Sequence, residues 1–170
     1  IADGEDFRTL TETLALFPEG EYSFDLDSGA SVGSTNVTHN IPAAPADVHF
    51  NGRKITWAYG DDLGECTTWP EGFSVADEAD IAGYEVVMEP DVDGLSHFKL
   101  TIRVPANVYH LRVPTSYLQS FEPDTPLKIE VGAIEEREDG TLGNQTFTEE
   151  GGFCARRNQK RCKLEEEQEE

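Results

Sequence analysis

Apolar and polar residues alternate in short runs along much of the chain, and turn-forming residues separate these runs. Alternation places every second side chain on one face of an extended strand, which is the pattern of a half-buried β-strand. The strongest run covers residues 127–134, and clear alternation returns at 98–104 and 108–113. Further strands are predicted at residues 21–27, 30–39, 54–59, 83–89 and 145–148, the last with Phe153. Strands do not alternate with helical patterns as a parallel sheet requires, so the sequence predicts an all-β protein.

One helical pattern precedes the strands. Phe7, Leu10 and Leu14 recur at the spacing of a single helical face. Asp3 is placed to cap the start of this helix. We expect the helix to end near Phe17, because the residue before a proline disfavours the helical conformation. The two strands that follow are separated by a Ser-Gly turn and predict a β-hairpin.

The segment 41–45 contains two prolines and cannot form a central strand, since proline has no backbone N–H to donate. We expect it to be a linker or a sheet edge. After it, about six or seven short strands follow, with turn signals at the spacing of a β-sandwich. The chain is therefore expected to have three parts: a helix and hairpin at 1–40 packed on the sandwich, the sandwich itself at 41–153, and a charged tail at 154–170.

The charge of the chain excludes several kinds of partner. There are 13 basic and 34 acidic residues, a formal net charge of −21. An acidic surface repels a phosphate backbone, so no nucleic-acid partner is expected, and anionic membranes are disfavoured for the same reason. No apolar run approaches the length of a membrane span. Self-repulsion of this size is relieved by salt, by bound divalent cations or by a basic partner.

The cysteines and the first residue indicate the compartment. The chain begins at Ile1 rather than Met, which is expected of a fragment or of a chain whose signal peptide has been removed. Cys154 and Cys162 are eight residues apart beside the last predicted strand, so a short-loop disulfide is a candidate. Cys66 could instead pair with either of them, since the count of three is odd. We expect a secreted protein, extracellular or at the cell surface. The segments 36–38 and 144–146 also match the Asn-x-Thr glycosylation tripeptide.

No catalytic arrangement is evident, and we expect no enzymatic activity. Nucleophilic catalysis needs a base oriented by a third group, but the four histidines stand in scattered strand and loop contexts. There is no Gly-x-Ser-x-Gly motif and no Gly-rich loop that could hold a phosphate. Zinc requires clustered Cys and His, and the two C-terminal cysteines have no neighbouring His.

Calcium is the metal that the acidic turns favour, because hard cations bind several carboxylate and carbonyl oxygens. Asp91 and Asp93 precede a glycine that permits a sharp turn. Asp61 and Asp62, together with Glu65, form a second candidate loop. Neither segment has a full calcium-binding loop motif, and solvated turns are the alternative interpretation.

An aromatic residue in the same region suggests a different ligand. Trp69 stands in a turn-rich acidic stretch, where an exposed indole could stack on a sugar ring. Its alternative role is to cover the core or a loop. The sequence leaves both interpretations open.

Several motifs resemble those of a known family. Residues 41–153 resemble a fibronectin type III-like domain of bacterial secreted proteins. The matching pieces are Ile55-Thr56-Trp57, Gly83-Tyr84-Glu85-Val86-Val87, residues 113–118, residues 127–134 and Gly143-Asn144-Gln145-Thr146. Residues 17–24 and 38–45 look like a segment that often precedes such a domain. The resemblance implies a fibronectin/immunoglobulin-like β-sandwich and a spacer, adhesion or interaction role, with no catalytic residues to carry over.

The function we predict is a non-catalytic secreted adhesion or structural interaction module. It would bind a protein partner or assemble with itself as a subunit of a repeating extracellular structure. The alternatives are a carbohydrate-binding accessory domain that uses Trp69, and a calcium-stabilised module of a larger enzyme.

Overall fold

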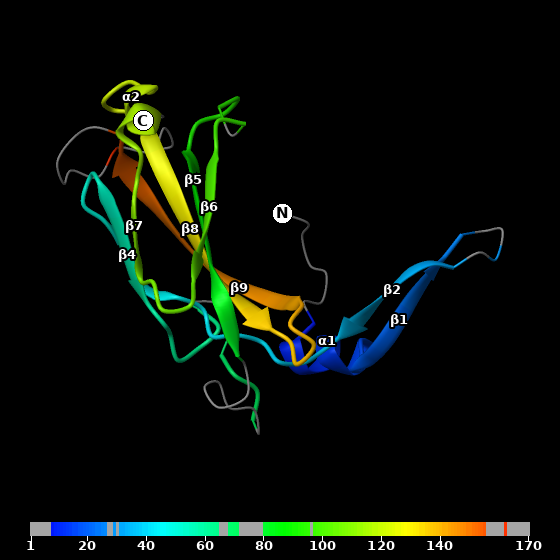
Figure 1. Ribbon diagram of the computed structural model, residues 1–170. Coiled ribbons are helices and arrows are strands. Elements are labelled where there is room, and N and C mark those ends of the chain that lie inside the picture. The colour runs from blue at the N-terminus through cyan, green and yellow to red at the C-terminus, as the bar shows by residue number, and fades with distance from the viewer. Residues whose placement is uncertain are drawn as a thin grey trace.

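The computed structural model describes residues 8–26, 29, 31–64, 68–71, 80–95, 97–155 and 162. Most of its ordered elements are strands in antiparallel sheets, which confirms the all-β prediction (Figure 1). The elements are α1 (Leu10–Leu16), β1 (Gly20–Asp25), β2 (Ser31–Val37), β3 (Ala46–Phe50), β4 (Lys54–Ala58), β5 (Ile81–Pro90), β6 (Leu100–Pro105), β7 (His110–Arg112), α2 (Thr115–Gln119), β8 (Pro126–Glu136) and β9 (Leu142–Cys154).

The described strands form three sheets. The hairpin β1-β2 is a sheet by itself, a second sheet has the order β3-β4-β7, and a third has the order β6-β5-β8-β9. Strand β8 lies in the middle of the largest sheet, where Val131 is opposite Val86 of β5 and Thr148 of β9. This central position explains why β8 has the strongest alternation in the sequence.

The two larger sheets share one hydrophobic core. Ile55 and Trp57 of β4 contribute to it from the three-stranded sheet, and Tyr84 of β5 contributes from the four-stranded sheet. The rings of Trp57 and Tyr84 meet edge to face, with centroids 5.5 Å apart. From β8, Leu127 and Ile129 are both fully buried. Alternating inward side chains thus form the core, as the strand pattern predicted.

Several elements differ from the prediction, β9 and α2 among them. Strand β9 was expected at 145–148 with Phe153, yet it runs from Leu142 to Cys154. Its register shifts between Leu127 and Ile129 of the partner β8, so a bulge lets pairing continue past the local Gly-Gly pair. The connection after β7 holds the short helix α2, which the pattern did not predict and which buries Leu118.

The proline segment is not a strand, as predicted, but it is not a peripheral linker either. All four residues from Pro42 to Pro45 are buried. The N–H of Ala44 donates to the carbonyl of Asp62, 2.8 Å away. A side chain on Gly60 would collide with the Ala44 carbonyl, so only glycine allows this close approach. The segment therefore packs into the body of the protein.

Helix α1 begins later than predicted. Thr9 is its N-cap and forms a reciprocal capping box with Glu12, and this local hydrogen bonding sets the start. Asp3 and Phe7, which the sequence assigned to the helix, lie outside the described residues. The helix ends at Phe17, as the following proline predicted.

The N-terminal segment meets the sheets only sparingly. Among the described residues, Pro42 is the first that is buried, so α1, β1 and β2 contribute none. The hairpin β1-β2 extends outward from the larger sheets (Figure 1). In the described part, the hydrogen bonds that join this segment to β8 and β9 begin at Thr38, and the predicted packing of the helix and hairpin on the sandwich stays a prediction.

Candidate interaction surfaces

The described residues of 8–37 form an extension that we call the arm, and it exposes large apolar side chains. On the hairpin, Phe24 and Leu26 are each 57% exposed and Val32 is 60% exposed. At the end of α1, Leu16 and Phe17 are 52% and 55% exposed. An isolated two-stranded hairpin is marginally stable in water, and exposed apolar groups in one region mark interaction sites.

The two faces of the hairpin differ in character. Tyr22 and Phe24 share one face, opposite Thr35 and Gly33 of β2. Glu21, Ser23 and Asp25 of β1 lie on the other face. Acidic residues dominate the arm's charge: its described carboxylates are Glu12, Glu19, Glu21 and Asp25, against the single cation Arg8.

A buried carboxylate joins the arm to the body. Glu135 of β8 is fully buried, and the hydroxyl of Thr38 donates to it, 2.8 Å from Oε1. The backbone N–H of Asn144 donates to Oε2 at 2.7 Å. The Asn144 amide in turn donates to the carbonyls of Thr38 and Asn40, at 3.0 and 2.9 Å. We call these residues the arm latch.

The backbone of β9 is shaped around this latch. A side chain on Gly143 would collide with the Glu135 carboxylate, so glycine leaves the space that the acid occupies. Sequence reasoning noted Asn144 in a glycosylation tripeptide and in the family-like motif at 143–146, and it missed the structural role of this residue. The available signal was Glu135 itself, an acid directly after the apolar run of β8.

A cationic surface covers the outer side of the three-stranded sheet. Because Ile55 and Trp57 point into the core, the alternate residues Lys54 and Thr56 point outward. Lys54 is directly opposite Arg112 of β7. The cationic face, as we name it, consists of Lys54 and Arg112, the exposed Arg53 directly before Lys54, and His49 and His110 on either side of Thr56.

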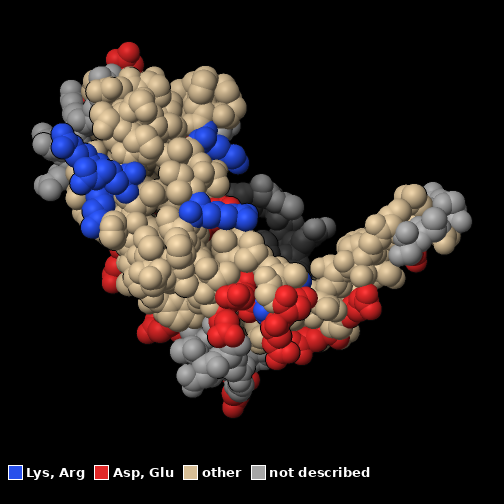
Figure 2. Space-filling view, viewed as in Figure 1, with Lys and Arg blue, Asp and Glu red and all other residues tan. Residues whose placement is uncertain are grey.

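The cations of this face have no acidic partner among the described residues. The printed sequence contains 34 acidic residues, yet the ion pairs in the described part are formed by Arg103 and Lys128. Arg103 binds Glu85 at 2.6 Å. Figure 2 shows Lys and Arg gathered over β4 and β7, while Asp and Glu gather near α1 and the β8–β9 turn. Charge is thus separated along the molecule.

Lys128, in contrast to the cationic face, is surrounded by acidic side chains. Its ammonium lies 3.1 Å from Glu149, 3.1 Å from Glu89 and 3.4 Å from Glu130. The hydrogen bond to Glu149 is the main cause of a raised pKa of the Lys128 ammonium. The cationic face lacks any such arrangement in the described residues.

The structure places part of the predicted calcium loop at Asp61, Asp62 and Glu65 beside an acidic pocket. Asp61 and Asp62 line a pocket of about 440 Å³, which Asp47, Glu149 and Glu150 also line. Asp62 uses its Oδ1 to accept the N–H groups of Leu63 and Trp69, at 2.8 and 3.2 Å. Glu65 lies outside the described residues.

The predicted calcium loop at Asp91 and Asp93 is a surface turn. Asp93 is exposed, Asp91 is half-buried, and Gly94 has a φ of +79° that favours glycine. Across the residues that the structure describes, no three His, Cys, Asp or Glu side chains lie close enough to hold a metal ion. Calcium binding by either loop stays a prediction.

Trp69 is partly buried rather than fully open to solvent. Its indole nitrogen is buried and has no hydrogen-bond partner in the described part of the chain. The hydrogen bond from its backbone N–H to Asp62 fixes its position beside the acidic loop that contains Asp61 and Asp62. Sugar binding at this residue also stays a prediction.

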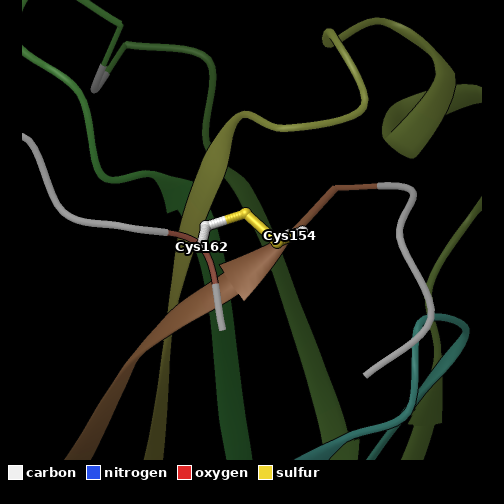
Figure 3. Close-up of a disulfide and its surroundings, with 2 residues drawn as sticks. All are labelled: Cys154 and Cys162. Atoms are coloured by element: carbon white, nitrogen blue, oxygen red, sulfur yellow. A yellow bond between two sulfur atoms is a disulfide. The ribbon is translucent and has the colours of Figure 1, made fainter. Parts of the chain in front are cut away.

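Of the pairings that the sequence left open, the structure contains the disulfide between Cys154 and Cys162 (Figure 3). Their Cα atoms are 5.2 Å apart, and the bridge joins the end of β9 to Cys162. The N–H of Cys162 also donates to the carbonyl of Gly152 at 2.9 Å, so Cys162 lies beside β9. Cys66 lies outside the described residues.

No family model matches this chain, and no curated protein matches it. Within the described residues, no helix has the length and apolar character needed to cross a membrane.

Proposed function

We propose that the chain is a fibronectin type III-like β-sandwich that works as a non-catalytic interaction module and assembles with itself. The strand order supports the fold proposal. The first, second and fifth strands after the proline segment form one sheet, and the third, fourth, sixth and seventh form the other. This division is that of an immunoglobulin-like sandwich whose fourth strand lies beside the third.

The exposed arm is the observation that carries the interaction role. It presents Phe17, Phe24 and Leu26 to solvent, and each is more than half exposed. Its latch fixes the base of the arm to β8 and β9 through Thr38 and Asn144. A projecting apolar element on a fixed base is suited to contact another protein.

The disulfide supports the proposed location. Disulfides form and persist mainly in oxidising compartments, including the extracellular space. The bridge between Cys154 and Cys162 therefore supports a secreted module that works outside the cell or at its surface.

The proposal is tested by sedimentation velocity across a wide concentration range. We expect wild-type protein to form concentration-dependent oligomers. The variant Phe17→Ser/Phe24→Ser should remain monomeric with an unchanged melting temperature, because neither side chain is part of the core. Phe98→Ser is the matched control, since Phe98 is 51% exposed but lies outside the arm. Wild-type protein that sediments as a monomer at every concentration would refute the proposed function.

A further inference from the structure

Resting on this proposed function, we propose that β1 of one copy's arm adds as a strand to the β7 edge of a second copy, against its cationic face. Among the described strands, only β4 pairs with β7, which makes β7 an edge of the three-stranded sheet. Strand β1 is also an edge in the described part, where β2 is its single partner. Each edge offers backbone groups that another strand can bind.

The first argument is that the cationic face places like charges opposite each other on neighbouring strands. Lys54 and Arg112 are directly opposite each other, and like charges in that position destabilise a sheet. No described acid neutralises them, although Lys128 in the neighbouring sheet has three carboxylates around it. Local conflicts of this kind are expected at functional positions. An incoming acidic strand would remove the conflict.

The second argument is that β1 has the complementary pattern. Glu21 and Asp25 lie on one face of β1, with Ser23 between them. Added beside β7, this face would continue the outer side of the sheet, where His110 and Arg112 are exposed. Successive side chains on one strand face are roughly 7 Å apart in both strands, so opposite charges can align.

The third argument concerns the apolar face of the arm. When a strand joins a sheet, its two faces continue the two faces of that sheet. Tyr22 and Phe24 would then lie on the core side, next to Leu111 of β7, which packs against the core. One arrangement therefore covers the exposed aromatic residues and neutralises the cations.

The charge pattern also favours β1, rather than a second copy of β7, as the strand that pairs with β7. A charged, three-residue strand such as β7 is a poor partner for another β7, because their cations repel. The acidic β1 has no such repulsion. Because the two contact surfaces differ, each copy can bind one neighbour through its arm and another through its cationic face. Assembly is then open-ended unless the rotation between successive copies closes a ring.

Charge reversal tests the inference. In the variant Arg112→Glu, the new carboxylate should repel the acidic β1 of the second copy. The dissociation constant of self-association should therefore rise roughly tenfold or more. The monomer should melt at a higher temperature, because residue 112 would then be opposite Lys54 with the opposite charge. A fold defect therefore cannot explain the loss. Lys99→Glu is the matched control: it makes the same change in charge at an exposed position outside the cationic face.

A mixing experiment identifies the two surfaces as partners. Glu21→Lys/Asp25→Lys should fail to assemble alone, as should Arg112→Glu. An equimolar mixture should assemble again, because the acidic arm of one variant meets the unchanged cationic face of the other. Unchanged assembly of the Arg112→Glu variant, or no recovery of assembly on mixing, would overturn the inference. Oligomers that still depend on the arm would in that case continue to support the proposed function. A monomeric wild type would refute both.

Discussion

At the scale of single residues, the arm latch shows how a charge is kept inside this protein. A buried carboxylate is costly unless hydrogen bonds replace the water that it loses. Glu135 receives them from Thr38 and from the N–H of Asn144. Asn144 also donates to the carbonyls of Thr38 and Asn40 and so fixes residues 38–40 at the base of the arm. The hydrogen bonds that offset the cost of burying Glu135 are therefore part of the same network that attaches the arm.

Replacing Thr38 with valine tests this anchor. Thr38→Val keeps the side-chain shape but removes the hydroxyl donor, so the unfolding free energy should fall by about 1–3 kcal/mol. Urea denaturation measures the change. Thr35→Val is the control, because Thr35 is exposed on β2 and its substitution should have little effect. Equal stabilities of the two variants would show that the latch does not hold the arm.

The latch also marks the limit of sequence reasoning about the site. The acidic loops and Trp69 can be recognised in the sequence because the residues of each candidate site are close together along the chain. The latch depends on Thr38 and Asn144 meeting across 106 positions, and only the fold brings them together. The cationic face is hidden for the same reason, since Lys54 and Arg112 become neighbours only when β4 pairs with β7.

At the scale of elements, alternation predicted β4, β5 and β8 because their alternate side chains are buried in the core, and it also predicted β1 and β2, which have no buried residue in the described part. It worked best for β8, whose inward residues from Leu127 onward are fully buried. It missed α2, which is too short to show a helical period. It also shortened β9, because the bulge and the Gly-Gly pair interrupt the alternation that pairing with β8 maintains.

The end of β9 gives a prediction at this scale. The bridge between Cys154 and Cys162 closes a short loop, with a sequence separation of eight residues. A loop of this length stabilises the fold by about 2–3 kcal/mol in the chain-entropy description. Cys154→Ser/Cys162→Ser should lower the unfolding free energy by that amount, measured by urea denaturation without reductant. Reductant should bring wild-type protein to the same value, and it should leave the variant unchanged.

At the scale of the whole molecule, the net charge of −21 opposes folding and assembly alike. The charges are unevenly placed, with cations over β4 and β7 and acids toward α1 (Figure 2). Contact between unlike ends of two copies is therefore favourable at short range, although the copies repel each other at long range. Salt shortens the range of that repulsion.

Salt should therefore raise the melting temperature of the monomer. The screening length falls from about 30 Å at about 0.01 M salt to about 3 Å at about 1 M. We expect a steady rise over this range in differential scanning calorimetry with sodium chloride. Calcium chloride at equal ionic strength should give the same rise if only screening acts. A larger rise would reveal calcium bound preferentially to the folded state, as the predicted loops require.

The absence of buried side chains from the described part of residues 8–37 has an evolutionary consequence. Substitutions there leave the packing of the body untouched, so under the proposed function recognition and folding would be inherited as separate traits. A lineage could then acquire a new binding specificity through substitutions in this segment alone. The same independence makes the body a scaffold on which a foreign strand can be grafted after Thr38, in place of the native hairpin.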